Sequence, residues 1–461
     1  VGGRGGAKEE IVENYTGEGA EFAYLMDRPN SLGNAPEIIV SAEDRQLLRD
    51  LGSRVAEIAA LPEQAERKRL WTKLNKLEAE KPMVWLNDIC WSEINVNDEL
   101  TLQTRSEFCK SIERELRQRL YWWNHMRGDM VVEPLIYAPM VVDDTGIGIN
   151  VEEDILATEE TNEVVSHGYH EVIQSEDDLD KIQMPRIKHY VEKSRANLDA
   201  YREIFDGVLE VSQRGFLGFN FSPWDHLVRL TGVQQALLDL VLRPELMHGI
   251  MQRLTDAAKV AIDQLEELNI FSLNNRNVRV GSGAYGYTDE MPSRDHDGEH
   301  VRAKDIWVFV AAQIFAEVSP EMHEEFALHY ERQILERFRL SYYGCCEPLF
   351  RKMHLMRTIP NLRKVSASPW NDLPSLAEQI GKDYVFSLKP NPEILARDTW
   401  DSAQVRADLK ETLRGIMRHG CHVEMIMKDI STVRHEPERL WDWTQIATEL
   451  AEEFAEHGTA V

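Results

Sequence analysis

The sequence predicts an α/β protein built as a (β/α)8 TIM barrel, with an N-terminal helical extension and an insertion after the second strand. Eight short apolar runs recur along the chain, and each ends in a polar or Gly/Pro-rich loop. Most of them lead into a helical pattern, which is typical of parallel strands joined by right-handed crossovers. Eight such units favour a closed barrel, whose site lies at the carboxyl ends of the strands.

The predicted strands follow one another in chain order. The first is residues 83–86, and with their loops the others occupy 129–142, 215–227, 270–287, 339–350, 361–373, 383–395 and 421–432. Helical spacing of apolar residues follows at 106–128, 231–269, 320–338, 374–381, 402–420 and 438–457.

The part before the first strand divides in two. Residues 1–40 begin with the glycine-rich VGGRGGAKEE, which has no apolar stretch, so we interpret them as a flexible or irregular leader and not a signal peptide. Residues 41–80 are predicted to be a helical extension, because Ser41 can cap a helix in which Leu47, Leu48, Leu51 and Val55 recur. Residues 81–461 form the predicted barrel, with residues 138–205 as its insertion.

Composition narrows the class of partner. The chain has 461 residues and a formal net charge of -27, so nucleic acid and anionic membrane surfaces are unfavourable partners. No apolar run approaches the roughly 20 residues of a membrane span. Five cysteines are too few and too scattered for a disulfide framework, which predicts a reducing cytoplasm.

The strand-end loops carry polar and aromatic side chains suited to a small organic ligand. The same residue types would also occur in ordinary polar loops and in a core, so each residue alone is ambiguous. The candidate substrate-binding residues are Trp91, Trp224, Asp225, Tyr285, Trp370, Lys389 and His329. For His329, a position on the surface of a helix is an equally good explanation.

The fifth predicted strand ends in SYYGCCEP, which places two adjacent thiols beside an acid. Thiolates and carboxylates are zinc ligands, so Cys345, Cys346 and Glu347 are the candidate metal ligands. Adjacent side chains in an extended segment point apart, so one cysteine is the better-placed ligand. Burial as a small apolar residue is the alternative, while a disulfide between adjacent cysteines would be strained.

Four further residues are candidate catalytic groups, which could protonate a leaving group or stabilise its charge. They come from the loops after the first, fourth and eighth strands and are Glu93, Tyr287, Lys428 and Asp429.

Several segments together resemble the uroporphyrinogen decarboxylase superfamily over residues 80–450. The carriers are GFNFSPWDHLVRLTGVQQALLDLVLRPELMHGIMQRLT, AEVSPEMHEEFALHYERQI, LSYYGCCEP and VFSLKPNPEIL. The resemblance implies a single (β/α)8 barrel and one of two chemistries, decarboxylation of tetrapyrrole acetates or zinc-dependent methyl transfer to or from a corrinoid or thiol. The GCCE, SPW and KPNP cluster resembles a branch grouped with the methyltransferases. Homodimers are common in the family.

The chain also departs from the family pattern. The decarboxylases carry an Arg-rich segment after the first strand, whereas this chain has NDICWSEINVNDE, with acids and no Arg. The zinc methyltransferases have His-x-Cys after the fifth strand and Cys after the eighth. Here Ser or Tyr stands where the His would fall, and Lys428 or Asp429 where the Cys would fall.

Three functions stay open at this point. The first is a metal-assisted methyltransferase that moves a methyl group from a small methylated or methoxylated compound to a thiol or to a corrinoid carried by a separate partner protein. The second is a decarboxylase or lyase acting on a small carboxylate held by Lys389 or Lys428. The third is a non-catalytic barrel that binds a small molecule.

Overall fold

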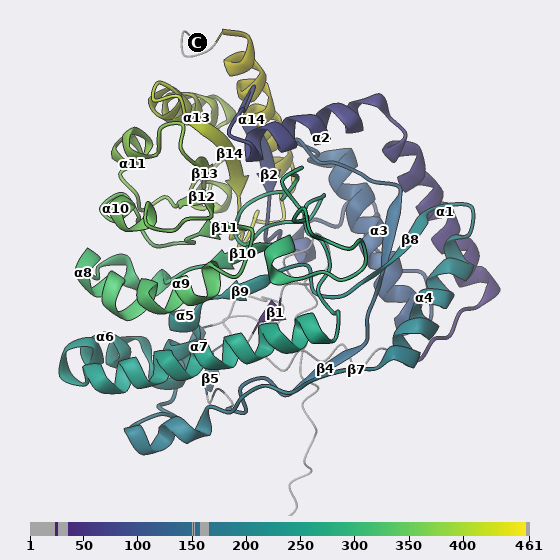
Figure 1. The fold of residues 1–461 in the computed structure, drawn as a ribbon. Helices are drawn as coiled ribbons and strands as arrows, with labels where there is room; N and C mark the ends of the chain where they lie inside the picture. The colour runs from purple at the N-terminus through teal and green to yellow at the C-terminus, as the bar shows by residue number, and fades with distance from the viewer. Residues whose placement is uncertain (1–23, 26–35, 150, 152, 157–165, 458–461) are drawn as a thin grey trace, which may run out of the picture.

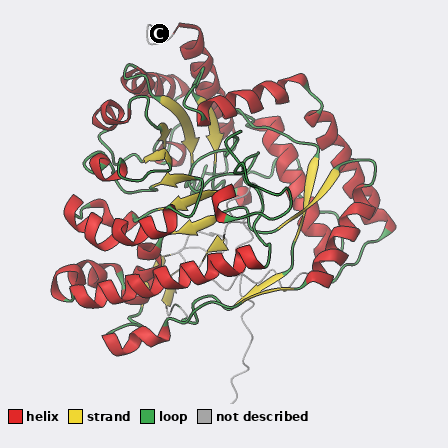
Figure 2. Cartoon of the chain, in the orientation of Figure 1, coloured by secondary structure: helices red, strands yellow, loops and turns green. Residues whose placement is uncertain are grey.

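The chain folds around one sheet of eight parallel strands (Figures 1 and 2). The computed structural model describes residues 24–25, 36–149, 151, 153–156 and 166–457. In spatial order the strands are β1 (Tyr24–Leu25), β9 (Phe219–Phe221), β10 (Trp307–Val310), β11 (Leu340–Tyr343), β12 (Leu362–Ala367), β13 (Val385–Leu388), β14 (His422–Met427) and β2 (Met83–Leu86). Within the described residues no pairing joins β1 to β2, so these two strands are the edges of the parallel sheet.

The strands are buried on both faces, as parallel strands covered by helices require. All four residues of β2, β11 and β13 are buried. Helices precede, connect or follow most of the strands, and the ribbon views show them around the sheet. From β9 onward they are α5 (Pro223–Thr231), α6 (Val233–Leu242), α7 (Pro244–Glu267), α8 (Pro320–His323), α9 (His329–Leu335), α10 (Met353–Met356), α11 (Leu373–Ile380), α12 (Glu393–Ala396), α13 (Ser402–Met417) and α14 (Glu438–His457). A π-helical turn, Glu324–Leu328, joins α8 to α9.

Helices α1 (Ala42–Ala59) and α2 (Pro62–Asn75) precede β2, and α3 (Glu107–His125) follows it. The Ser41 hydroxyl caps α1 by accepting a hydrogen bond from the Asp44 amide at 3.0 Å. At the other end of this pair, the Asn75 side chain donates to the carbonyls of Tyr285 and Tyr287 at 2.9 and 2.8 Å. The division into leader, extension and barrel stays a prediction, and most of residues 1–40 lie outside the described residues.

The second predicted strand is wrong as a member of the main sheet. Its segment contributes β3 (Leu135–Pro139), which pairs in parallel with β8 (Glu210–Arg214) as a separate two-stranded sheet. Helix α4 (Val191–Phe205) packs against this pair, with Ile204 and Phe205 fully buried. Strand β3 is therefore buried by β8 and α4, outside the central sheet.

The fourth predicted strand, 270–287, is also wrong, because its residues contribute only single bridges such as Phe216 with Phe271. Its glycines lie against core side chains: a Cβ on Gly283 would sit 2.5 Å from a ring carbon of Tyr342. The segment is therefore a packed loop, and β10 takes its place beside β9. The unbroken apolar run Ile306–Ala312 is the signal that would have located β10.

The predicted insertion contains two antiparallel pairs. They are β4 (Val142–Asp144) with β7 (Ile187–His189), and β5 (Glu153–Leu156) with β6 (Ser166–Tyr169). A short 3-10 helix, Glu176–Lys181, lies between β6 and β7.

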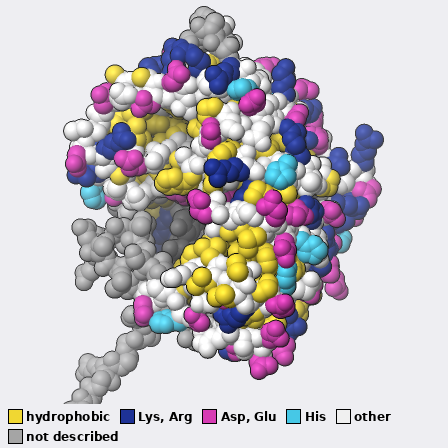
Figure 3. All heavy atoms as spheres, turned by 90° about the vertical axis from the view of Figure 1, so that its left-hand side faces the viewer, with side chains coloured by type: hydrophobic (Ala, Val, Ile, Leu, Met, Phe, Trp, Pro, Cys, Tyr) yellow, Lys and Arg dark blue, Asp and Glu magenta, His cyan; other side chains and the backbone are white. Residues whose placement is uncertain are grey.

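On the face drawn in Figure 3, acidic and basic side chains are interspersed with hydrophobic ones. Figure 3 shows hydrophobic side chains gathered in the lower half of one face, where α6 lies. No helix among the described residues combines the length and hydropathy needed to cross a membrane.

Candidate active site

The candidate site lies at the carboxyl end of β11. Gly344 follows the strand with φ +93°, a conformation that suits glycine, and turns the chain at Cys345. The Gly344 carbonyl accepts a hydrogen bond from the Ser282 hydroxyl at 3.2 Å. The turn thereby places Cys345 at the edge of the sheet where the loops after the parallel strands meet.

The two adjacent thiols differ in chemistry. The sulfurs of Cys345 and Cys346 lie 3.8 Å apart, and Cys345 is only 7% exposed. The hydrogen bond from the Cys346 thiol lowers the pKa of Cys345 well below its usual value, and Lys428 and Lys389 lower it further against the opposing effect of burial. The same hydrogen bond raises the pKa of Cys346. Of the two cysteines, Cys345 is therefore the one that ionises more readily.

Lys428, which follows β14, supplies the countercharge. Its ammonium nitrogen lies 3.7 Å from the Cys345 sulfur, 2.7 Å from an Asp429 oxygen and 3.8 Å from an Asp88 oxygen. Burial disfavours the ammonium, but the negative charges of Cys345, Asp429 and Asp88 together raise the pKa of Lys428. Arg279 in turn holds Asp88 at 3.0 Å. These alternating charges favour the protonated form of Lys428 and the ionised form of Cys345.

Lys389, which follows β13, fixes the backbone of the cysteine loop. Its ammonium donates to the hydroxyls of Ser282 and Ser366 at 2.7 and 2.5 Å and to the Cys345 carbonyl at 3.3 Å. These acceptors use all three of its N–H donors. Lys389 therefore joins three loops and adds positive charge near the thiolate.

Glu347 points into the protein. Its two carboxylate oxygens accept from the backbone amides of Ala312 and Cys345 at 3.0 and 2.8 Å, and the side chain is fully buried. Burial, with the nearby Cys345 charge, raises the pKa of Glu347. Asp225 is bound similarly by Gln313, and burial raises its pKa, to which the charges of Glu347 and Cys345 add. Both acids shape the loops around the site.

The residues present do not fit the expected zinc site. A catalytic zinc takes about three protein ligands, whereas here two sulfurs converge and the Glu347 oxygens are bound to backbone amides. Across the part of the chain that the structure describes, no group of three or more His, Cys, Asp and Glu side chains is arranged to hold a metal ion. The Lys428 ammonium occupies the position beside Cys345 that a cation would need.

The structure brings together Cys345, Cys346, Lys428, Asp429 and Lys389, with Glu347 and Asp225 behind them. The remaining predicted residues serve other contacts. The Trp224 ring nitrogen donates to the Phe326 carbonyl at 2.9 Å, and Glu93 links the loops after β2 and β14 through Thr432 and the Val433 amide, both at 2.8 Å. Trp91 packs near Trp122. Tyr285 packs against Tyr287, whose ring lies under the Lys68 ammonium. His329 and Trp370 are exposed.

A buried polar network behind the site was not predicted from the sequence. The Tyr343 hydroxyl donates to Glu331 at 2.6 Å and lies 2.7 Å from His323 Nε2, while Lys352 lies 3.1 Å from His323 Nδ1. Burial raises the pKa of Glu331 to about 8 and, with the Lys352 charge, lowers the pKa of His323 to about 3. The spacing of these residues in the sequence does not predict the network, because they lie in separate segments that meet only in the folded chain.

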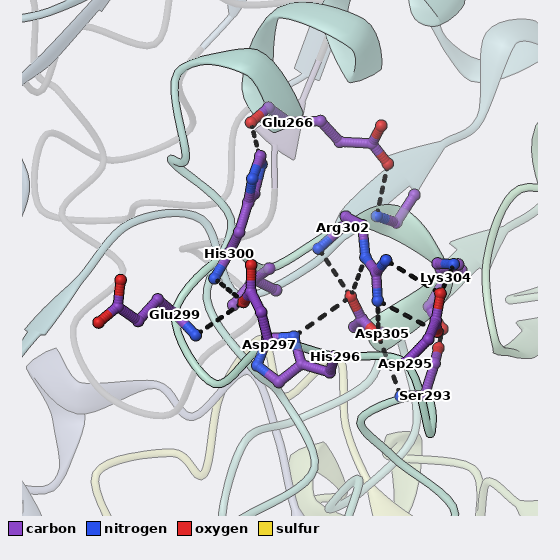
Figure 4. Close-up of polar contacts among 12 residues, drawn as sticks. Glu266, Ser293, Asp295, His296, Asp297, Glu299, His300, Arg302, Lys304 and Asp305 are labelled. Carbon is purple, nitrogen blue, oxygen red and sulfur yellow. Dashed lines mark hydrogen bonds and ion pairs between the residues drawn. The ribbon is translucent and has the colours of Figure 1, made fainter.

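A cavity of about 560 Å³ lies at the opposite, amino end of the strands, where β11 and β12 begin. Ser293, Lys304, Arg339 and Arg363 are among its lining residues. Figure 4 shows Lys304 beside Asp295 in a chain of ion pairs that continues through Arg302 to Asp305. The length of β11, roughly 13 Å, separates this cavity from Cys345, so it is not part of the thiolate site.

Comparison with models of known protein families finds no match, and comparison with curated proteins also finds none. Among solved structures, the chain is similar to a methyltransferase from Methanosarcina mazei, with 12% sequence identity and a TM-score of 0.45. That alignment covers 83% of this chain and 98% of the other.

Proposed function

We propose that this protein is a methyltransferase whose nucleophile is the Cys345 thiolate and whose substrate is a small methylated or methoxylated compound. The observation that supports this most directly is the 3.7 Å contact between the Cys345 sulfur and the Lys428 ammonium at the carboxyl edge of the sheet. A thiolate is the reactive form of cysteine, and a pKa below the usual value keeps it populated at neutral pH. The GCCE, SPW and KPNP resemblance supports methyl transfer as the chemistry.

The proposed step is a displacement at the methyl carbon. The Cys345 sulfur donates an electron pair and forms an S–C bond while the bond between the methyl carbon and its oxygen or nitrogen breaks. The departing atom keeps that bonding pair and takes a proton from the Lys428 ammonium, which regains a proton from water. Asp429 and Asp88 hold the ammonium in place, so the proton donor is positioned before the reaction begins.

The acceptor of the methyl group from Cys345 is, by the resemblance, a thiol or a reduced corrinoid carried by a separate partner protein. No step is assigned to zinc, because the donor set does not fit it. A reducing cytoplasm would suit this chemistry, since it keeps both thiols of the pair reduced.

The two other candidate functions have weaker support. Carboxylate binding by Lys389 would have to displace two hydroxyls and a carbonyl, and binding by Lys428 would have to displace Asp429. Burying charges costs free energy. A barrel that only binds a small molecule would give the ionised cysteine and its charged neighbours no function that explains this cost.

We also infer that the sheet curls into the expected barrel. A Cβ on Gly283 would lie 2.5 Å from Tyr342 of β11 and 3.0 Å from Glu424 of β14, while Asn87 after β2 donates to the Gly283 carbonyl at 3.0 Å. One loop therefore lies against both β11 and β14, which two other strands separate in the sheet, and it contacts the residue that follows β2, and this supports a curled sheet.

The test is to incubate the reduced protein with a panel of methylated and methoxylated compounds and to measure peptide masses. The expected result is a mass gain of one CH2 unit on the peptide that contains Cys345, and its loss from the pool when a reduced corrinoid or a thiol is added. Cys345→Ser should abolish labelling, while Cys421→Ser, at a buried position on β14's amino side, should leave it unchanged. Full turnover by Cys345→Ser would refute the proposal.

A further inference from the structure

The cysteine loop holds two sulfurs close together with no bond between them. The sulfurs of Cys345 and Cys346 lie 3.8 Å apart, although adjacent side chains of a strand point to opposite faces. The turn at Gly344, with φ +93°, ends the extended backbone just before the pair. A disulfide would need the sulfurs at about 2 Å and would be strained between adjacent residues. The spacing therefore suits one bridging atom better than a direct bond.

Hydrogen bonds fix the backbone of the pair before any ligand arrives. The Cys345 amide donates to the Glu347 carboxylate at 2.8 Å. The Cys345 carbonyl accepts from the Ser366 hydroxyl at 2.6 Å and from the Lys389 ammonium at 3.3 Å. Cys346 is only half-buried, so the pair can be reached from solvent. A ligand that bonds to both sulfurs would cost little conformational freedom, because both are already in place.

The bridging atom has to bond to sulfur and must need only two ligands from the protein. Zinc fails the second condition, since a catalytic zinc takes about three protein ligands. Within the described residues, no third His, Cys, Asp or Glu side chain is arranged with the pair to complete a metal site. Trivalent arsenic with one carbon substituent meets both conditions, because it forms three bonds in all and, as a soft centre, prefers thiolates.

The charges around the pair also favour a neutral bridge. A zinc ion would bring two positive charges beside the Lys428 ammonium, which lies 3.7 Å from the Cys345 sulfur. An arsenic atom bonded to one carbon and two sulfurs has no net charge. Lys428 would keep Asp429 at 2.7 Å and Asp88 at 3.8 Å, and Arg279 would keep Asp88 at 3.0 Å. Two cations would then face two carboxylates, so the bridge leaves no buried charge without a partner.

We propose that Cys345 and Cys346 together bind a monosubstituted trivalent arsenical, R–As(OH)2, and that the bridge closes the site to methyl donors. Two As–O bonds break and two As–S bonds form. The oxygens leave as two water molecules with the two thiol protons, or with a proton from solvent where Cys345 is already ionised. Arsenic stays trivalent and the sulfurs are not oxidised, so no oxidant or reductant is needed. The block on methyl donors rests on the proposed function, whereas the binding itself does not.

The probe is methylarsonous acid, CH3–As(OH)2, added to the reduced full chain after removal of the reductant, with no methyl donor or corrinoid present. The expected intact mass has one CH3As group in place of two hydrogens, and the peptide with Cys345 and Cys346 should no longer react with iodoacetamide. Dithiothreitol should remove the arsenic and restore both thiols. Dimethylarsinous acid, which can bond to one sulfur only, should bind at least about 100-fold more weakly, because it gains no second, intramolecular bond.

Cys346→Ser removes one of the two sulfurs and should weaken binding of methylarsonous acid at least about 100-fold. The matched control is Cys421→Ser, because the Cys421 thiol donates to the Ala377 carbonyl at 3.4 Å and takes no part in the pair. Urea unfolding checks that both variants are folded, and the comparison of the two arsenicals needs no substitution.

The proposal would be overturned by a wild-type chain that takes up no arsenic, by equal affinity for the two arsenicals, or by a Cys346→Ser variant that binds like the wild-type chain. Where methyl labelling of Cys345 is observed, prior treatment with methylarsonous acid should abolish it. Tight binding of the arsenical by a chain that never acquires a methyl group would instead refute the proposed function alone.

Discussion

At the scale of single residues, the cysteine pair is the feature that sequence reasoning located and the structure redefined. The sequence predicts that the fifth strand ends within SYYGCCEP, and β11 ends there at Tyr343. The role of Glu347 could not be predicted, because the Ala312 amide that binds it lies 35 positions away. Lys428 was expected from its place after the eighth strand, but its closeness to the sulfur depends on how two distant loops pack.

Alkylation of Cys345 should depend on pH less steeply than that of an ordinary thiol around neutral pH, because its pKa lies well below the usual value for a thiol. An ordinary thiol would instead react about tenfold faster for each pH unit. Lys428→Met should raise the pKa of Cys345 and slow its reaction with iodoacetamide at neutral pH by about tenfold or more. Rates are measured for each cysteine by peptide mass spectrometry.

Cys421 provides an internal control in the same samples. Burial raises its pKa to about 12, so it should react slowly at every pH in the series. Lys304→Met, at the amino edge, should leave the Cys345 profile unchanged. A Cys345 rate that rises steeply through pH 8 in the wild-type chain would contradict the assigned thiolate.

At the scale of elements, prediction succeeded where burial alone decides the outcome. Strands β2, β9 and β11–β14 fall within predicted runs, because short apolar segments buried on both faces have few alternatives. Prediction failed where the structure of a segment depends on the segments that it pairs with or packs against. β3 is equally apolar but pairs with β8, and 270–287 has strand-like residues whose glycines fit a loop against Tyr342.

Gly344→Ala tests how the end of β11 positions the site. With φ +93° and a new Cβ only 2.8 Å from Leu349 and 3.1 Å from Ser366, the variant should lose about 2–4 kcal/mol of stability in urea unfolding. The shifted turn should also slow Cys345 alkylation, since the distance to Lys428 depends on it.

Gly207→Ala is the matched control for this variant. Gly207 has φ +70° but open space around its Cα, so only the backbone cost of about 1–2 kcal/mol applies. Cys345 reactivity should be unaffected by it. Equal stability losses in the two variants would show that the contacts with Leu349 and Ser366 do not constrain the turn.

At the scale of the whole molecule, the sheet divides the chemistry between its two edges. The carboxyl edge gathers the thiolate, two lysines and Asp429, and the amino edge holds ion pairs and the 560 Å³ cavity. Behind the carboxyl edge, the network of Glu331, Tyr343 and His323 buries titratable groups inside the protein. Because their pKa values differ between the folded and unfolded chain, these groups make the stability of the whole fold depend on pH.

The two groups have opposite effects on the free energy of unfolding. The pKa of Glu331 is raised from 4.5 to about 8, so its contribution is fully present below pH 4.5 and is lost as pH rises toward 8. The pKa of His323 is lowered from 6.5 to about 3, so stability is instead lost as pH falls from 6.5 toward 3. The two effects oppose each other between pH 4.5 and 6.5, and above pH 6.5 the Glu331 effect is the one of the two that remains.

Glu331→Gln should therefore make the slope of stability against pH more positive than in the wild-type chain between pH 6.5 and 8, because the variant lacks a group whose contribution falls with rising pH. The wild-type chain is expected to lose up to about 1.4 kcal/mol per pH unit there through this group, because folding must hold one proton that the unfolded chain releases. Urea unfolding at half-unit pH intervals measures the slope, which is independent of any constant loss caused by the substitution. Glu336→Gln, an exposed acid just after α9, should keep the wild-type slope. If Glu331→Gln keeps it too, Glu331 is ionised in the folded protein, and the pH dependence must come from other groups.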